Sequence, residues 1–163
     1  NSDLANNYGN LCQRVFSFIK NNCSNMVNKS KNISDSDKRL IEKTRKLTAD
    51  LRDEINNQNL NNYIKSTIEI SFLTNKYIND EEPWKLKQKN IEKMNNILHL
   101  ALEQIAIISM LLNPIIPTAS SKVLDALNIN KKIKNLSFLD GKKIITNKIN
   151  INNLEVLFKK INQ

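Results

Sequence analysis

Glycine and proline are scarce in this sequence of 163 residues, which holds two glycines and three prolines. A β-sandwich or a nucleotide-binding α/β domain needs many tight turns or phosphate loops, so this scarcity argues against both classes. A chain of this length can bury one sizeable core, and a single domain is the expectation. The composition therefore favours a helical domain.

Residues for metal and thiol chemistry are also few, because the chain has one histidine and two cysteines. Cys12 and Cys23 are separated by 11 positions in what reads as one helix, so they would lie roughly 16 Å apart, too far for a disulfide. We expect two reduced thiols, as in a cytoplasmic protein, and no zinc site. His99 is expected to be a partly buried helical residue with one hydrogen bond, and Glu92 and Glu103 to be solvated.

Catalytic motifs are missing as well. No Ser-His-Asp set, glycine-rich phosphate loop or metal-ligand spacing occurs, so the sequence indicates no active site of its own. The longest apolar run, Ile105 to Leu112, is interrupted by Ser109 and is far shorter than the ~18 residues of a membrane span. We expect no membrane partner. The first residues resemble neither a signal peptide nor a tag, and we expect the chain to be a piece of a larger protein.

What the chain does have is positive charge: 25 basic against 16 acidic residues, a formal balance of +9. Such a balance suits a polyanion such as nucleic acid. However, asparagine occurs 28 times, isoleucine 22 times and lysine 21 times against four arginines, which reads as a codon bias toward A and T. The net charge alone is compatible both with a polyanion partner and with a codon bias that has no bearing on function.

Apolar residues at three- and four-residue spacing predict an all-α antiparallel helical bundle. The first helix is expected from Asp3 to about Asn28, and Ser34 with Asp37 gives an N-terminal cap signal for the second. The inward-facing residues expected on the second and third helices are Leu40, Leu47, Leu51, Ile55, Ile64, Ile68, Phe72 and Ile78.

Pro83 suits the first turn of a fourth helix, which is expected to begin near Trp84 and to end before Asn113-Pro114. Its predicted inward stripe is Ile91, Met94, Leu98, Leu102, Ile105, Ile108 and Leu112. A short helix is predicted over about 118–127, with Val123, Leu124 and Leu127 facing inward. We expect residues 1–163 to form one domain, a bundle over about 1–127 and a less regular C-terminal extension over about 128–163. In the extension we expect a turn at Asp140-Gly141, an extended piece and a last helix over about 154–161.

Two places offer binding chemistry. Asn10 and Arg14 are four residues apart, so an amide and a guanidinium share one helix face, and both can hydrogen-bond a base edge. Gly9 beside them would let another backbone come close. Trp84, the only tryptophan, lies among charged residues and could stack an unpaired base. A solvated polar pair and a buried tryptophan anchor are the competing interpretations.

The opening DLANNYGNLCQRVFSFI resembles the start of the anticodon-binding domain of bacterial methionyl-tRNA synthetases. NKYINDEEPWKL is similar to the family's segment ending in Pro-Trp, LLNPIIPTASSKVLDALNI to its proline-containing elbow and next helix, and LDGKKI with LFKKI to its closing segment. The resemblance covers essentially the whole chain. It departs at Lys159, where the family often has proline.

This resemblance implies an α-helical bundle that reads the CAU anticodon of tRNA(Met). By motif match, the anticodon-binding roles fall on Trp84 as the stacking residue, Asn10 and Arg14 as readers of base edges, and Pro83 as the residue that shapes the loop. Cytosine at the first anticodon position is the base we expect this set to read. Unpaired loop bases are the usual target of sequence-specific RNA recognition.

The resemblance also implies that the full-length protein is a methionine-tRNA ligase that uses ATP and Mg²⁺. The nucleotide-binding half is absent from this sequence, so the chain alone is expected to be non-catalytic and to hold no cofactor. Its expected partners are the tRNA anticodon loop and the enzyme's own catalytic domain, with no DNA. Two alternatives remain: a helical protein-interaction domain with Trp84 buried, and the equivalent domain of another class I synthetase for an aliphatic amino acid.

Overall fold

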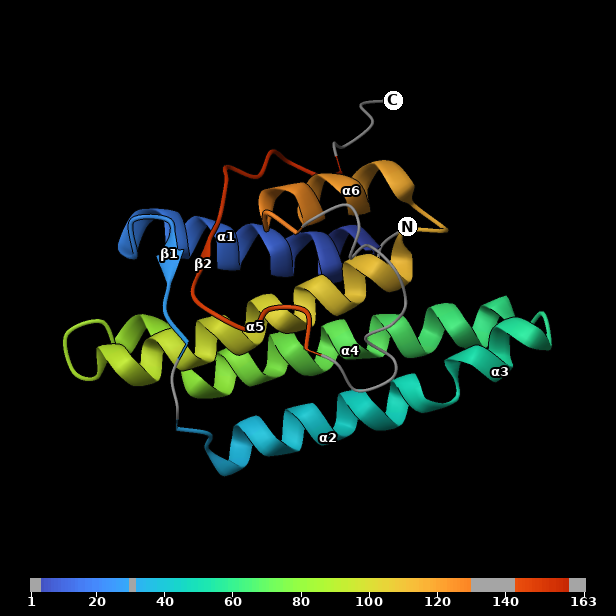
Figure 1. The fold of residues 1–163 in the computed structure, drawn as a ribbon, viewed down its shortest axis with the longest axis horizontal. Helices are drawn as coiled ribbons and strands as arrows, with labels where there is room; N and C mark the ends of the chain where they lie inside the picture. The colour runs from blue at the N-terminus through green and yellow to red at the C-terminus, as the bar shows by residue number, and fades with distance from the viewer. Residues whose placement is uncertain (1–3, 30–31, 130–142, 159–163) are drawn as a thin grey trace.

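A computed structural model describes residues 4–29, 32–129 and 143–158 as an all-α bundle with a small two-stranded sheet (Figure 1). This confirms the predicted fold class. The helical elements are η1 (Leu4–Gly9, a π-helical turn), α1 (Asn10–Asn22), α2 (Asp35–Ala49), α3 (Leu51–Asn56), α4 (Leu60–Glu81), η2 (Pro83–Lys85, a 3₁₀ turn), α5 (Ile91–Leu112) and α6 (Pro117–Ala126). The strands are β1 (Met26–Val27) and β2 (Ile149–Asn150), which pair antiparallel.

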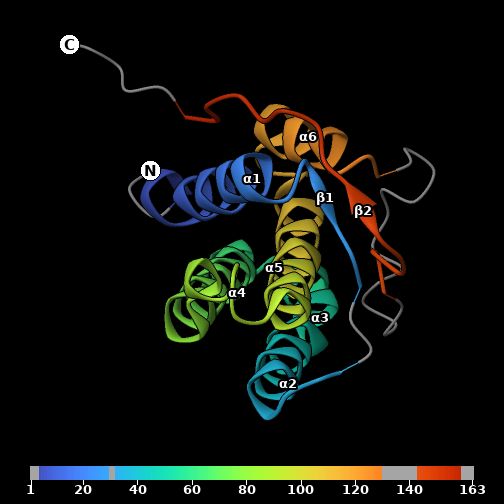
Figure 2. The same ribbon diagram turned by 90° about the vertical axis from the view of Figure 1, so that its left-hand side faces the viewer.

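Helix α5 lies at the centre of the bundle and packs against α1, α4 and α6 (Figures 1 and 2). The predicted stripe is buried from Met94 to Leu112, while its first member, Ile91, is 63% exposed. By length and composition α5 could cross a membrane, but 83% of its most apolar window is buried among the other elements. An all-round apolar helix covered by its neighbours is the pattern of a core helix.

Local capping explains where several helices begin and end. The predicted cap of α2 is confirmed as a capping box, in which Ser34 Oγ accepts from the Asp37 amide and the Asp37 carboxylate accepts from the Ser34 amide. The first helix was expected to reach about Asn28 and ends instead at Asn22. Ser24 and Asn25 adopt φ of 49° and 62°, a left-handed conformation that terminates a helix and leads the chain into β1.

The predicted second helix is divided, because α2 ends at Ala49 and α3 begins at Leu51. Leu40 and Leu51 are buried as predicted, and Ile55 is 41% exposed. On α4, Ile68 and Ile78 are buried as predicted, but Phe72 is 49% exposed. The buried face of α4 includes two polar residues, Thr67 and Thr74, which donate to the carbonyls four residues earlier. A pattern that counts only apolar residues therefore misplaces the buried face of this helix.

The predicted short helix is confirmed as α6, with Val123, Leu124 and Leu127 buried. The described part of the C-terminal extension, residues 143–158, contains β2 and no helix, so the last helix was wrongly predicted for residues 154–158. Asp140-Gly141 and Lys159 lie outside the described residues. Backbone bonds hold this tail on the bundle: the Ile151 amide donates to Asn25 O at 2.8 Å and the Asn152 amide to Ala126 O at 2.7 Å.

Gly9 marks the place where the tail crosses the start of the chain. A Cβ atom built on Gly9 would lie 2.7 Å from Cδ2 of Phe158, so the close neighbour is an aromatic ring and not the backbone that the sequence suggested. The Phe158 ring also packs edge-on against Tyr8, with centroids 6.4 Å apart. The absence of a side chain at Gly9 therefore makes room for the tail.

We expect Gly9→Ala to lower the free energy of unfolding by about 1 kcal/mol, because the new methyl group displaces Phe158. Gly9 has helical dihedral angles, so in a Phe158→Ala background the same change should stabilise by up to about 1 kcal/mol through better helix propensity. Urea unfolding of the wild type, the two single variants and the double variant measures both effects: the loss of stability with Phe158 present and the gain with Phe158 removed. An equal effect of Gly9→Ala in both backgrounds would contradict the contact.

All three tyrosines are buried, and burial raises the pKa of Tyr8, Tyr63 and Tyr77 above the ordinary value of tyrosine. For Tyr77 the hydrogen bond that it donates to Asp37 raises the pKa further. Groups whose pKa is raised on folding contribute stability that is complete below the unfolded pKa, about 10, and is lost as pH rises through the folded values.

The free energy of unfolding should therefore fall as pH rises above about 10. Urea unfolding at pH 8 to 11 measures the loss, and tyrosinate absorbance reports ionisation. In the folded protein the absorbance should stay low at pH 10, while the same protein unfolded in urea should titrate near that pH. Ordinary titration at pH 10 with an intact helical circular dichroism spectrum would contradict the burial of these hydroxyl groups.

Candidate nucleic-acid interface

Pro83 and Trp84 lie in η2, the tight connection between α4 and α5. Glu82 has φ 46° and ψ 59°, a left-handed conformation that ends α4, and Pro83 begins the 3₁₀ turn. Helix α5 starts only at Ile91, where the Asn90 side chain caps it by accepting from the Lys93 amide. The prediction of a helix beginning near Trp84 was therefore wrong by about two turns. Pro83 is buried, whereas Trp84 is 43% exposed.

Arg14 of α1 reaches the same end of the bundle. Its guanidinium carbon lies 6.0 Å from the centroid of the Trp84 ring, within the range of a cation–π interaction. Figure 2 views the molecule from this end, with α1 above α4 and the α4–α5 connection facing the reader. The structure thus brings together two of the predicted site residues, which are 70 positions apart in the sequence. An exposed indole and a guanidinium form one continuous surface.

Two asparagines of α4 hold this guanidinium in place. Arg14 donates to Oδ1 of Asn79 at 2.7 Å and to Oδ1 of Asn75 at 3.4 Å. Asn75 in turn donates to Oδ1 of the buried Asn7 at 2.6 Å, and the Ser71 hydroxyl donates to the same oxygen at 3.1 Å. These acceptors are neutral, and within the described residues no carboxylate pairs with Arg14. The cation is oriented without being neutralised.

The asparagine contacts were not predicted from the sequence. Asn75 and Asn79 are spaced four apart on the third predicted helix, the same spacing that drew attention to Asn10 and Arg14. In a chain with 28 asparagines this spacing carries little information. Only the packing of α4 against η1 and α1 shows that this pair faces Arg14.

Asn10, the first residue of α1, is exposed and lies one helical turn before Arg14. It lines an open hollow with its neighbours on η1 and α1 and with the end of the tail; the lining residues are Ala5, Asn6, Gly9, Asn10, Gln13, Val156, Leu157 and Phe158. Its side chain makes no hydrogen bond to another described residue, so the amide is available to a ligand. The structure does not place Asn10 in the Arg14–Trp84 contact itself.

Two lysines follow Trp84 on the same connection. Lys85 forms an exposed ion pair with Glu82 at 2.8 Å, and Lys87 donates to the Asn22 side chain at the end of α1, at 3.0 Å. Lys87 has no carboxylate partner among the described residues. A stacking ring, a guanidinium, free amides and cations that can meet phosphates are the groups by which proteins read unpaired RNA bases.

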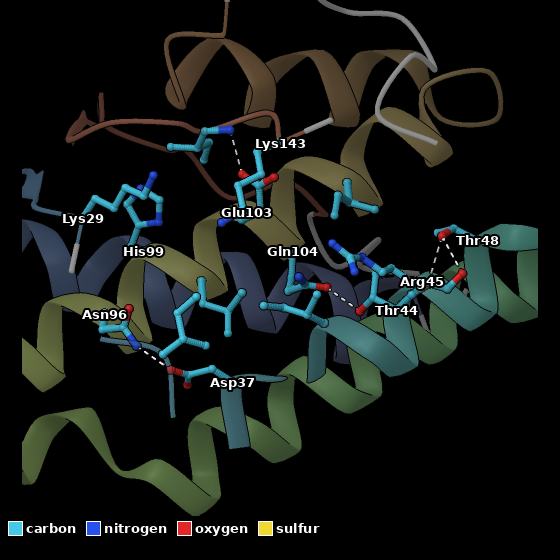
Figure 3. A pocket seen from close by; sticks show the side chains of 15 residues that line it. Lys29, Asp37, Thr44, Arg45, Thr48, Asn96, His99, Glu103, Gln104 and Lys143 are labelled. Atoms are coloured by element: carbon cyan, nitrogen blue, oxygen red, sulfur yellow. Dashed lines mark hydrogen bonds between the residues drawn. The ribbon is translucent and has the colours of Figure 1, made fainter. Parts of the chain in front are cut away.

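A separate cavity of about 130 Å³ lies between α2, α5 and residues 143–145 (Figure 3). Its polar groups are largely paired within the protein: Asn96 donates to Asp37, Thr44 donates to Gln104, and the amides of residues 144 and 145 donate to Glu103. Burial raises the pKa of Glu103, so the prediction that this residue is solvated was wrong.

His99 borders the same cavity and shares one hydrogen bond with Asn147 O at 2.9 Å, as predicted for a partly buried helical histidine. Burial lowers its pKa. Glu92 is exposed, as predicted. Within the described ranges, no group of three or more His, Cys, Asp or Glu side chains could hold a metal ion. Cys12 and Cys23 are free thiols, and burial raises the pKa of both, which disfavours the reactive thiolate.

Comparison with known proteins gives a consistent result. A family model described as the anticodon binding domain of methionyl tRNA ligase matches residues 27–163. A methionine–tRNA ligase of Rickettsia felis is 36% identical over 135 residues, covering 81% of this chain and 26% of that protein. A probable cytoplasmic methionine–tRNA ligase of Dictyostelium discoideum is 30% identical over 131 residues, covering 79% of this chain and 18% of that protein.

Among solved structures, the free form of Mycobacterium tuberculosis methionyl-tRNA synthetase superposes with a TM-score of 0.91 at 23% sequence identity. The superposition covers all of this chain and 33% of that one, and at this identity it supports the fold alone. The chain spans about a quarter of the length of the relatives that it matches. The matched family segment includes Pro83 and Trp84 and begins after Asn10 and Arg14.

Proposed function

This chain belongs to the family of the anticodon binding domain of methionyl tRNA ligase, and we propose that it reads the CAU anticodon of tRNA(Met) at the surface formed by Arg14 and Trp84. The observation that supports this most strongly is the exposed indole 6.0 Å from a guanidinium that no described carboxylate neutralises. Both groups lie at one end of the bundle, where an unpaired loop can reach them.

In this proposal Trp84 stacks one unpaired anticodon base, and Arg14 and Asn10 hydrogen-bond base edges. Pro83, which is buried, fixes the backbone that presents the indole. Cytosine at the first anticodon position is the base read by the set. Cytosine offers an amine donor and a carbonyl acceptor on its pairing edge, to which an amide and a guanidinium are complementary. Lys85 and Lys87 lie close enough in sequence to Trp84 to meet the phosphates of the same loop.

The parent protein would attach methionine to its tRNA with ATP and Mg²⁺, in the cytoplasm, with this domain acting in cis with a catalytic domain. In this proposal the chain contributes recognition of the tRNA, and catalysis belongs to the catalytic domain. Pyrophosphate exchange assays with methionine and ATP should show no activity for the isolated chain. Exchange above background would refute the division of roles.

Recognition of the base is tested by substitutions that keep the positive charge of a side chain and change the geometry of its hydrogen-bond donors. Arg14→Lys keeps the positive charge but loses the planar fork of donors, so it should lose discrimination among anticodon stem-loops that differ at the first position. Asn10→Ala should reduce the same discrimination. Arg39→Lys, at an exposed position of α2, is the control and should change neither affinity nor discrimination. If Arg14→Lys and Asn10→Ala both discriminate as the wild type does, these residues are not base readers.

A further inference from the structure

Phe72, in the middle of α4, is a large aromatic side chain that the fold leaves 49% exposed. This is a larger exposed fraction than the 43% of Trp84. The buried face of α4 is formed by other residues, including Thr67, Ser71 and Thr74. The exposed ring therefore contributes little to the core of the described domain. A single exposed apolar residue is ordinary on a protein surface, so the case for binding depends on what lies beside the ring.

The position of Phe72 follows from the contacts of its neighbours on the helix. Asn75 and Asn79 lie three and seven residues further along α4, and both bond Arg14. Residues at these spacings share one helix face, so Phe72 lies on the side of α4 that carries the Arg14 contacts. The helical rise puts it about 4.5 Å along the axis from Asn75 and about 10 Å from Asn79. The aromatic ring thus extends the Arg14–Trp84 surface along α4.

Two lysines and two acidic residues surround Phe72 on α4, so the ring has cations beside it without a local excess of positive charge. Lys65 and Lys76 flank it at spacings of seven and four residues, and both are exposed. Lys76 forms an exposed pair with Asp80 at 3.2 Å, and Lys65 has no ion-pair partner among the described residues. Glu69, three residues before Phe72, is the one acidic residue at a neighbouring helical spacing. Phe72 and the two lysines thus resemble the surroundings of Trp84, where an aromatic ring that can stack a base also lies beside cations.

We propose that Phe72 is a second stacking platform, which takes an anticodon-loop base other than the one that stacks on Trp84. This inference rests on the proposed function, because it places the same RNA loop along α4. Base–aromatic stacking needs only a π-face, so this contact would add affinity with little preference for base identity. Trp84 with Arg14 would discriminate between bases, and Phe72 would keep the anticodon loop in position along α4.

The test is binding of the chain to the CAU anticodon stem-loop with Phe72→Ala, Phe72→Leu and Phe72→Trp. Phe72→Ala should weaken binding at least about fivefold, the lower end of what stacking contributes. Phe72→Leu keeps an apolar side chain without a π-face and should lose as much, while Phe72→Trp should bind as well as the wild type. Leu60→Ala, on a residue of α4 that is 59% exposed, is the matched control and should change nothing.

The loop base is identified by repeating the comparison with stem-loops that lack one base at a time. At a single position other than that served by Trp84, removal of the base should abolish the difference between wild type and Phe72→Ala. Trp84→Ala, measured in parallel, reports the proposed function separately. If Trp84→Ala impairs binding and Phe72→Ala does not, the second platform is refuted and the anticodon site stands.

The exposed face of α4 could instead contact another part of the parent enzyme. In that case Phe72→Ala would leave stem-loop binding by this chain unchanged and would lower the thermal stability of the full-length protein. That pair of results would overturn the stacking proposal. Equal losses for Phe72→Ala and the Leu60→Ala control would overturn it as well, because they would show a nonspecific effect of exposed apolar surface.

Discussion

Trp84→Ala should weaken binding of the CAU anticodon stem-loop about 5- to 150-fold, the equivalent of about 1 to 3 kcal/mol for a lost base stack. The fold should persist, because the indole is 43% exposed and the buried residue of η2 is Pro83. Loss of the indole also removes the cation–π partner of Arg14. Discrimination at the first anticodon position should therefore decrease together with affinity.

Titration of labelled stem-loops measures this effect, with circular dichroism to verify the helical content. Trp84→Phe is the matched control, because it keeps a stacking face and should retain most of the affinity. A variant Trp84→Ala that unfolds would show that the indole is a core anchor. A folded variant with unchanged affinity would show that it is not a base contact. Either result would withdraw the role assigned to Trp84.

Asp37→Ala should lower the free energy of unfolding by about 3 kcal/mol, the largest effect on stability that we expect from a single substitution. The carboxylate is 2% exposed and accepts hydrogen bonds from Tyr77 Oη at 2.6 Å, Asn96 Nδ2 at 2.6 Å and the Ser34 amide at 2.8 Å. The substitution leaves the donors of Tyr77 and Asn96 without this acceptor. It also removes one of the two hydrogen bonds of the capping box of α2, while Ser34 Oγ still accepts from the backbone amide of residue 37.

The matched control is Asp35→Ala, which removes an acidic residue from the same first turn. The Asp35 side chain is 82% exposed and forms only a surface pair with Lys38, so its loss should change stability by less than about 0.5 kcal/mol. Urea unfolding of both variants gives the comparison. Similar small effects of the two substitutions would show that the hydrogen-bond cluster around Asp37 does not hold α2 against α4 and α5.

Signals that are local in sequence predicted the fold well. The capping box at Ser34 and Asp37, the end of α5 before Asn113 and the buried residues of α6 each depend on one or two turns of chain, and all were confirmed. The errors lie where tertiary packing decides. Ser24 adopts a left-handed conformation after α1 although no glycine in the sequence signals it, so the first helix was predicted too long. Pro83 begins a 3₁₀ turn and not α5, so the fourth helix was predicted to start too early.

In the candidate site, too, sequence motifs identified some residues and only the packed structure identified the others. Motif resemblance singled out Asn10, Arg14, Pro83 and Trp84, and the structure brings Arg14 and Trp84 within 6.0 Å of each other. Asn75, Asn79 and Asn7 could not be found, because asparagine is the commonest residue of the chain and only the packed helices show which ones face Arg14. The exposure of Phe72 was hidden by the buried threonines of α4, which an apolar pattern does not count.

The measurement that tests the central proposal most directly is binding of the unaltered chain to stem-loops with CAU or with another base at the first anticodon position, at two salt concentrations. Phosphate contacts weaken with salt alike for every loop, whereas discrimination by base contacts survives. We predict that affinity for all loops falls as salt rises and that the preference for CAU remains. Equal binding of all loops at both salt concentrations would show that the +9 charge alone attracts RNA and would contradict anticodon reading by this domain.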